Sequence, residues 1–328
     1  MTEPTLSVTV TNYNYAPYLD QNLESILSQT YDDFEVIIVD NASTDRSLEI
    51  LRRHAAVDPR IRIIEHATNE GIFTSFREAS DACRGRYRVH VDADDWVLEP
   101  DAFEEQVTLL EKHPSMAFCY SAMTMIDAGG QPVHIAHPHR GDVVQPGELA
   151  LEGLLTFNLT HTGMMLRLDA YRSSRGYRDD VPHVADMLLA VHMCETGDVG
   201  YIDRSLYAFR QHTANLHLSP QLEVVKREIL PVIAAAFDGP LGARVPDARA
   251  VRRRVEQNAL VHLPWQYIFT GQRRTGWRLY WESVKLRPYD TVVQRATLHL
   301  LARTILGTRG YEWLESRFGR HRTGGADE

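Results

Sequence analysis

The sequence contains only three cysteines, Cys83, Cys119 and Cys194, and no two of them have Cys-x-x-Cys spacing. An odd number of scattered cysteines excludes a disulfide framework and gives no sign of a zinc site. The sequence also lacks any run of about 18 apolar residues, and its first residues lack the basic-then-apolar pattern of a secretory signal. We therefore expect a protein of the reducing cytoplasm without a membrane-spanning helix.

The composition is not extreme in any direction. Hydrophobic residues make up 44% of the 328 residues and charged residues 24%, fractions that exclude disordered and fibrous proteins. The net charge of −9 is unevenly distributed: residues 249–322 contain 15 basic and 5 acidic residues, whereas the rest contains 20 basic and 39 acidic. The basic segment predicts contact with an anionic surface, either a membrane, a nucleic acid or the acidic part of the chain itself.

The larger acidic part of the chain disfavours nucleic acid, because it repels phosphate. We expect no nucleic-acid partner. The basic C-terminal helices are expected either to make peripheral contact with the inner face of a membrane or to dock on the acidic part. Aromatic residues accompany the arginines and fit either interfacial anchoring or core packing. They are Trp265, Trp277, Tyr280 and Trp281.

Short apolar runs alternate with helical patterns over the N-terminal part of the chain. We expect strands at Leu6–Thr11, Phe34–Val39, Arg60–Glu65 and Tyr87–Val91. Apolar residues with helical spacing lie between them, at residues 19–27, 45–51 and 73–83. This alternation predicts a parallel α/β sheet with right-handed crossovers, in which ligands bind outside the carboxyl ends of the strands.

The elements that follow are less regular. The polar stretch Asp127–Pro146 predicts a functional loop or a mobile lid, Ala185–Cys194 a helix, and Gly200–Arg210 a short hairpin or a pair of strands. A segment rich in glycine and proline then predicts a linker. We therefore expect two parts, residues 1–238 and a basic, all-helical region at residues 239–328.

Polar side chains follow three of the predicted strands. They are Asn12-Tyr13-Asn14, Asp40-Asn41 and Asp92-Ala93-Asp94-Asp95. Hard cations such as Mg²⁺ or Mn²⁺ prefer oxygen ligands, and one or two carboxylates with phosphate oxygens are the usual set. The pattern Asp-x-Asp is also typical of an ordinary solvated turn. Three acidic residues around one crevice favour the metal site, because close carboxylates repel one another unless a cation or hydrogen-bond donors offset them.

The order of four motifs resembles that of the family 2 glycosyltransferases. The motifs are Ser7-Val8-Thr9-Val10-Thr11-Asn12-Tyr13-Asn14, Val39-Asp40-Asn41-Ala42-Ser43-Thr44-Asp45, Asn69-Glu70-Gly71 and Val91-Asp92-Ala93-Asp94-Asp95. The resemblance implies the GT-A fold, a Rossmann-like α/β architecture with a mixed, mainly parallel sheet flanked by helices. The all-helical C-terminal region would then be an appendage to it.

The resemblance also implies a site for a nucleotide-activated sugar. Asn12, Tyr13 and Asp40 would line the nucleobase pocket, and Asp92 would contact the ribose or a metal-bound water. Three further residues would complete the site. In the family an arginine often faces the pyrophosphate; Phe76 occupies that position here, and the adjacent Arg77 would take its place. These three are Asn69, Arg77 and Ala93.

The remaining implied roles concern the metal and the chemistry. Asp94 would ligate Mn²⁺ or Mg²⁺, and His212, at the end of Tyr207-Ala208-Phe209-Arg210-Gln211-His212, would approach the metal or the diphosphate. Asp186 falls where the family has its catalytic base. One attack assisted by one base predicts inversion at the anomeric carbon.

The expected function is therefore metal-dependent transfer of a sugar from a nucleoside-diphosphate sugar to a hydroxyl acceptor. UDP is the nucleotide expected first, with dTDP or GDP as alternatives. Three kinds of acceptor fit the sequence equally well: a cell-surface glycan, a lipid-linked sugar and a natural product. Two other functions fit the same fold, a sugar nucleotidyltransferase and a non-catalytic carbohydrate-binding protein. The first is disfavoured because no glycine-rich, lysine-bearing phosphate loop lies between Leu6 and Leu19.

Overall fold

The computed structural model describes residues 3–157, 162–178, 180–181, 183–211, 224–269 and 273–286. The chain divides into two compact units. One contains Met1–Ser219 and Pro231–Arg252, and the other contains Pro220–Leu230 and Arg253–Glu328. The division at residue 238 expected from the sequence stays a prediction.

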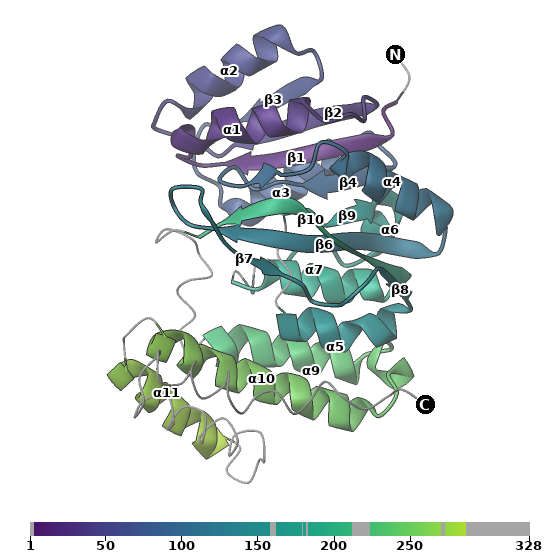
Figure 1. Cartoon of the computed structure of the whole chain (residues 1–328), viewed down its shortest axis with the longest axis vertical. Helices are drawn as coiled ribbons and strands as arrows, with labels where there is room; N and C mark the ends of the chain where they lie inside the picture. Colours follow the sequence, from purple (N-terminus) through teal and green to yellow (C-terminus); the bar gives the residue numbers. More distant parts are fainter. Residues whose placement is uncertain are drawn as a thin grey trace. The chain divides into compact units, whose positions relative to one another are not determined.

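Four parallel strands form the N-terminal half of the sheet (Figure 1). Strand β1 pairs with β2 on one side and with β4 on the other, and β2 pairs with β3. All seven residues of β1 and of β2 are buried, as expected for strands that are covered by helices on both faces. The four predicted strands are confirmed as β1 (Leu6–Asn12), β2 (Phe34–Asp40), β3 (Ile61–Glu65) and β4 (Tyr87–His90).

Among the described residues, ten strands form one sheet with the central order β3-β2-β1-β4-β9-β6-β10-β5. β9 runs antiparallel to both of its neighbours, whereas β6 and β10 are parallel over a long stretch. The predicted class, a mixed and mainly parallel sheet flanked by helices, is confirmed. The remaining strands are β5 (Trp96–Val97), β6 (Met116–Ile126), β7 (Pro132–Ala136), β8 (Val143–Gln145), β9 (Met165–Arg167) and β10 (Asp198–Arg210).

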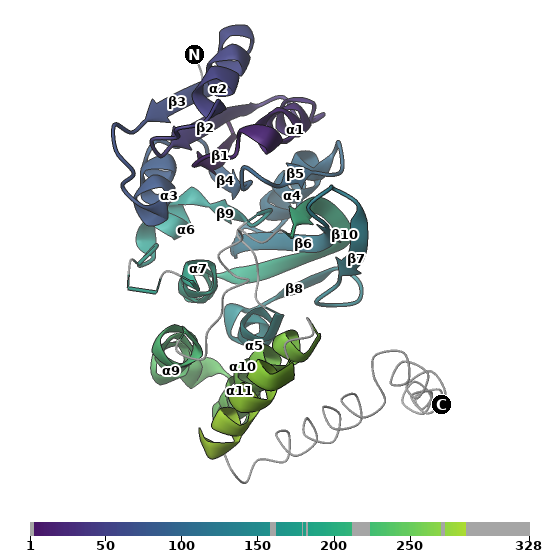
Figure 2. The same ribbon diagram turned by 90° about the vertical axis from the view of Figure 1, so that its left-hand side faces the viewer.

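Helices cover both faces of the sheet. Figure 2 shows α3 on one face of strands β1 and β2 and α1 on the opposite face. The helices of this part are α1 (Ala16–Leu27), α2 (Ser47–Val57), α3 (Ile72–Asp81), α4 (Ala102–Lys112), α5 (Gly147–Phe157), α6 (Leu168–Ser173) and α7 (Ala185–Cys194). Nine of the ten residues of α7 are buried, which explains why its sequence is apolar on all sides.

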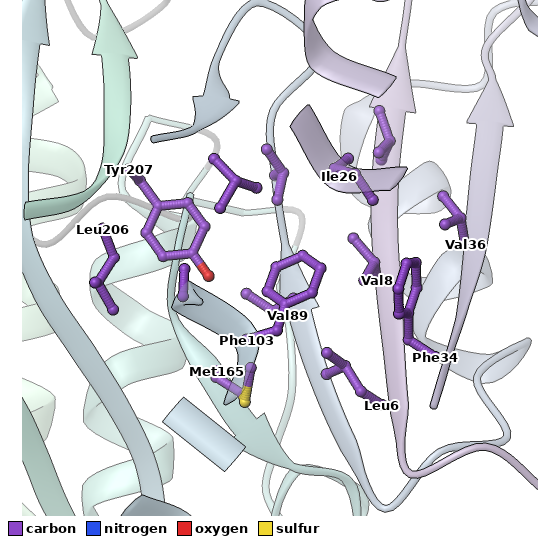
Figure 3. Close-up of a cluster of buried hydrophobic side chains, with 14 of the residues drawn as sticks. Leu6, Val8, Ile26, Phe34, Val36, Val89, Phe103, Met165, Leu206 and Tyr207 are labelled. Atoms are coloured by element: carbon purple, nitrogen blue, oxygen red, sulfur yellow. The ribbon is translucent and has the colours of Figure 1, made fainter. Parts of the chain in front are cut away.

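The hydrophobic core joins the strands to α1 and α4 (Figure 3). Phe34 of β2 and Phe103 of α4 meet edge to face, with ring centroids 5.7 Å apart. Tyr207 of β10 is fully buried and donates a hydrogen bond of 2.5 Å from its hydroxyl to Oε1 of Gln106, so its polar atom is satisfied. The core thereby fixes the strand ends at which the polar motifs lie.

Two sequence expectations are wrong. Asp127–Pro146 is not a single loop, because it contains the short strands β7 and β8, whose residues are all exposed or half-buried and so give no signal of a buried strand. Gly200–Arg210 is not a hairpin but the greater part of one strand, β10. The register of β10 shifts between Ile202 and Ser205, and this bulge contains the polar residues that suggest a turn in the sequence.

Among the residues described after position 223, the regular elements are all helices, as expected. The elements are η2 (Val225–Ile229), α9 (Leu230–Asp238), η3 (Gly242–Arg244), α10 (Ala248–Phe269) and α11 (Arg273–Leu286). In the described part of the chain, no helix combines the length and the apolar character needed to span a bilayer.

Candidate functional site

The carboxyl ends of β1 and β2 meet at a pair of buried polar side chains. Asn12 lies opposite Asp40 in the parallel register, and Nδ2 of Asn12 donates to Oδ1 of Asp40 at 2.6 Å. The same Asp40 carboxylate accepts hydrogen bonds from the backbone N–H and the hydroxyl of Ser43, at 2.9 and 2.6 Å. Asp40 is fully buried and held rigidly, while the neighbouring Tyr13 is 43% exposed. The structure brings together the three residues expected around the nucleobase.

The loop after β3 is tied to the same place. Nδ2 of Asn41 donates to Oδ1 of Asn69 at 3.0 Å, and Oδ1 of Asn41 accepts the backbone N–H of Glu70 at 2.8 Å. Asn69 therefore lies beside the end of β2, and its part in binding a nucleotide sugar stays a prediction. Arg77 lies half-buried in α3, the helix that follows this loop.

A tight turn of acidic residues follows β4. The N–H of Asp95 donates to the backbone oxygen of Asp92 at 3.0 Å, which closes the turn. Nδ2 of Asn22, a buried residue of α1, donates to the backbone oxygens of both Asp92 and Asp95 at 2.9 Å. Asp94 is 8% exposed, and Ala93 is 1% exposed and can offer a ligand little beyond its backbone. The backbone of the acidic turn is thus fixed by Asn22 of α1.

Arg210, the last residue of β10, holds the acidic turn from a second side. Its backbone N–H donates to Oδ1 of Asp95 at 2.8 Å, and its Nε donates to the backbone oxygen of Asp94 at 2.9 Å. Its guanidinium also lies over the rings of Tyr18 and Trp96. Arg210 has no role among the sequence-based expectations, although its position two residues before His212, in Phe209-Arg210-Gln211-His212, is a signal.

The acidic turn creates a strongly negative environment. Burial, followed by the charges of Asp94 and Asp92, raises the pKa of Asp95 well above its ordinary value. Burial and the charges of Asp94, Asp92 and Asp95 likewise raise the pKa of the Tyr15 hydroxyl. Such a cluster favours a bound cation, since a cation removes the repulsion among its carboxylates.

Asp92 is oriented by two side chains that sequence analysis did not assign. Nε2 of His90 lies 3.1 Å from Oδ1 of Asp92, and the hydroxyl of Thr162 lies 3.0 Å from Oδ2. The backbone N–H of Asp92 also donates to the Thr162 hydroxyl, at 3.1 Å. The sequence signal for His90 was a titratable residue inside a buried strand, two positions before the first aspartate.

Asp186 lies in the first turn of α7, where its Oδ1 accepts the backbone N–H of Met187 at 2.7 Å. Burial raises the pKa of Asp186 to about 7, and the charge of Asp92 contributes in the same direction. The contribution of Asp92 means that the two carboxyl groups lie within electrostatic range of each other. A carboxylate with a pKa near neutrality is suited to proton transfer at physiological pH.

The described residues contain no group of three histidine, cysteine or acidic side chains that could hold a metal ion on their own. A divalent cation shared with a diphosphate needs only one or two carboxylates. Asp92 and Asp94 fit that requirement, while Asp95 faces inward to Arg210 and Thr162. His212, the other predicted ligand, lies outside the described residues.

The site thus combines a hydrogen-bonded polar cluster at the ends of β1 and β2, an acidic turn after β4 and a carboxyl group of raised pKa on α7. Two solved structures have a similar fold. The Staphylococcus aureus protein TarS, residues 1–349, was solved with UDP-GlcNAc; it matches with a TM-score of 0.59 at 17% identity, over 80% of this chain and 81% of that one. The mannosyltransferase PcManGT of Pyrobaculum calidifontis, solved with GDP-Man and Mn²⁺, matches with a TM-score of 0.61 at 16% identity, over 98% of this chain and 89% of that one.

Sequence comparison is more specific. The family described as glycosyl transferase family 2 matches residues 7–174, just over half of the chain. Chondroitin synthase of Escherichia coli is 30% identical over 230 residues, which are 70% of this chain but 32% of that protein. EpsE of Bacillus subtilis is 33% identical over 212 residues, 63% of this chain and 73% of that one. The chain belongs to glycosyl transferase family 2 and is a glycosyltransferase of GT-A fold.

Proposed function

We propose that the protein transfers a sugar from a nucleoside-diphosphate sugar to a hydroxyl acceptor, with inversion at the anomeric carbon and with the help of a divalent cation. The observation that supports the proposal is the rigidly held Asp92–Asp95 turn after β4, together with Asp186, whose pKa is raised to about 7 by burial and, to a smaller extent, by the charge of Asp92. One group of carboxylates suits the diphosphate and its cation, and the other carboxyl group suits the acceptor.

The donor would be held by residues that the fold has already fixed. Asp40, locked by Asn12 and Ser43, offers an acceptor to a base N–H, and the exposed ring of Tyr13 offers a stacking surface. UDP is the first nucleotide we propose, because TarS was solved with UDP-GlcNAc; GDP, from the complex of PcManGT, and dTDP are the alternatives.

The chemical step would depend on Asp186. When ionised, its carboxylate removes the proton from the acceptor hydroxyl as that oxygen attacks the anomeric carbon and the bond to the diphosphate breaks. Mn²⁺ or Mg²⁺, held by Asp94 with Asp92 nearby, supplies electrostatic stabilisation of the leaving diphosphate when bound. A second carboxylate is not needed as a nucleophile, so the configuration inverts. Chondroitin synthase among the relatives favours a glycan acceptor.

A thermal-shift screen with sugar nucleotides tests the class and the donor together. We expect one of UDP-, dTDP- or GDP-sugars to raise the unfolding temperature in the presence of Mn²⁺, and to do so less in EDTA. A ligand at a hundredfold excess over its Kd stabilises the folded state by about 2.7 kcal/mol. If no sugar nucleotide stabilises the protein with any divalent cation, the proposed function is wrong.

We also propose that α11 contacts an anionic membrane surface. Four exposed residues recur at spacings of four, three and four along this helix and so share one face: Arg274, Arg278, Trp281 and Lys285. Trp281 is 55% exposed, whereas the neighbouring Tyr280 is 1% exposed and packs inward. Cations beside an exposed tryptophan suit the headgroup region of a bilayer.

Vesicle sedimentation tests this contact. Replacing Arg274, Arg278 and Lys285 with glutamine should lower partitioning onto vesicles of phosphatidylserine and phosphatidylcholine about 100-fold, since each cation near the surface contributes about 1 kcal/mol. Added salt should weaken binding of the unmodified protein in the same direction.

The matched control removes three other arginines, Arg46, Arg52 and Arg53, which form ion pairs with acidic residues of the same unit. This control changes the net charge equally and should leave partitioning almost unchanged. Equal loss in both variants, or in neither, would argue against a membrane-binding face on α11.

A further inference from the structure

The side chains behind Asp92 form a continuous polar chain inside the sheet. Arg88, Thr9 and His90 are each at most 2% exposed. Nε of Arg88 donates to the Thr9 hydroxyl oxygen at 3.1 Å, and the same oxygen lies 3.0 Å from Nδ1 of His90. Nε2 of His90 then lies 3.1 Å from Oδ1 of Asp92. The chain therefore runs from a buried guanidinium to the first aspartate of the acidic turn.

The direction of the hydrogen bonds follows from counting protons. A carboxylate oxygen only accepts, so Nε2 of His90 must carry the proton that points to Asp92. The Thr9 oxygen already accepts from Arg88, and its single proton can go to Nδ1 of His90 at 3.0 Å or to the backbone oxygen of Val89 at 3.3 Å. The shorter contact makes Thr9 the donor to Nδ1, which places the ring proton on Nε2.

The surroundings of His90 fix the ring as well as its proton. Phe76 meets the imidazole edge to face at 5.0 Å, and Tyr177 stacks on Phe76 at 5.3 Å. The Tyr177 hydroxyl in turn accepts a hydrogen bond from Arg88 at 3.0 Å. The contact with Phe76 and the hydrogen bond with the Thr9 hydroxyl leave the imidazole ring little freedom to turn away from Asp92.

We propose that His90 is a positioning residue, whose Nε2–H holds the Asp92 carboxylate in the orientation that receives the donor nucleotide. Arg88 and Thr9 fix which ring nitrogen carries that proton. The hydroxyl of Thr162 lies 3.0 Å from the other oxygen of Asp92, but its contact with Oδ2 of Asp95 is shorter, at 2.6 Å. The role in nucleotide binding rests on the proposed function. The geometry rests only on the buried hydrogen bonds among Arg88, Thr9, His90 and Asp92.

The tautomer can be measured without any ligand. A long-range ¹H–¹⁵N spectrum of the whole protein should show His90 protonated at Nε2, with its signals identified by their loss in His90→Gln. Thr9→Val, which keeps the shape of the side chain, should shift the Nδ1 signal because it removes the donor to that nitrogen. An unprotonated Nε2 in the unmodified protein would overturn the proposal.

Two amides of different reach separate positioning from packing. Glutamine places its N–H₂ near the position of Nε2, and asparagine near that of Nδ1, so His90→Gln can donate to Asp92 while His90→Asn cannot. Calorimetric titration with UDP and Mn²⁺ should give a Kd raised at least about tenfold in His90→Asn, the usual cost of losing a group that orients a metal-site carboxylate. His90→Gln should bind nearly as well as the unmodified protein.

Equal weakening in both amides, or in neither, would overturn the role of His90, because that role requires the amide that can donate to Asp92 to bind better than the one that cannot. Thermal unfolding of each variant shows whether the sheet is intact. If the unmodified protein binds none of UDP, dTDP and GDP with Mn²⁺, the proposed function is wrong, and His90 then has no role in nucleotide binding. The tautomer measurement still decides the geometry in that case.

Discussion

Replacing Asp186 with asparagine should lower the rate of sugar transfer by about 100- to 10,000-fold, the range that a general base contributes. Asparagine has nearly the same shape but cannot take the proton from the acceptor hydroxyl. Because Asp186 would act on the acceptor and not on the nucleotide, the Kd of the donor should change little. Measuring kcat and the donor Kd in parallel therefore isolates the chemical step.

The pH dependence gives the same assignment an independent check. Since the pKa of Asp186 is about 7, kcat/KM should rise with pH up to about 7 and level off above it. Stability should show the opposite trend. Between its ordinary pKa and 7 the folded state retains a proton that the unfolded state releases, so the free energy of unfolding falls as pH rises across this window. Asp186→Asn should lose both trends.

A nearby exposed carboxylate offers the control for this variant. Asp180 pairs with Arg178 at the surface and is 57% exposed in its side chain. Asp180→Asn removes the same charge from the same segment and should leave transfer unchanged. Retention of near-normal kcat in Asp186→Asn would place the base elsewhere.

The sequence was sufficient for the parts of the site that depend on strand ends. Asn12 and Asp40 are predictable partners because both end parallel neighbouring strands, which brings them to one edge of the sheet. The Asp92–Asp95 turn is predictable for the same reason. The local sequence pattern is enough to predict where these strands end, and the ends of neighbouring parallel strands lie at one edge of the sheet.

The supporting side chains could not be predicted, because their contacts join segments distant in the chain. Thr162 is 70 residues from Asp92, and Arg210 is 115 residues from Asp95. Neither lies in a pattern that specifies its neighbour. His90 could be predicted to be buried, but its role appears only when Thr9 and Asp92 are found on either side of the ring.

The misread strand β10 has a similar explanation. Its middle residues Asp203 and Arg204 are charged and suggest a turn. In the structure Arg204 pairs with Glu99, Asp101 and Glu105, and Asp203 accepts from His137. Charges within a strand are tolerated where a bulge turns them toward partners from other elements. That pairing depends on the tertiary fold, so a sequence pattern does not report it.

Replacing Asp94 with asparagine should lower metal-dependent transfer by about 100- to 1,000-fold, the usual loss when one preorganised electrostatic group is removed from a transition state. The backbone of the turn should keep its shape, since the hydrogen bond from Nε of Arg210 to the backbone oxygen of Asp94 does not depend on the side chain that is replaced. The variant should therefore lose the gain in nucleotide affinity that Mn²⁺ gives, while weak binding of the nucleoside part persists. Calorimetry with UDP, with and without Mn²⁺, measures that difference.

Stability distinguishes this loss from misfolding. The charge of Asp94 raises the pKa of Asp95 and of Tyr15, so removing it relieves repulsion in the turn. Asp94→Asn should then unfold at a temperature no lower than that of the unmodified protein in EDTA. Glu104→Gln, on the exposed face of α4, removes the same charge away from the turn and should change neither transfer nor metal response. Full metal-stimulated activity in Asp94→Asn would remove this residue from the metal site, because a neutral amide in its place could not neutralise a divalent cation.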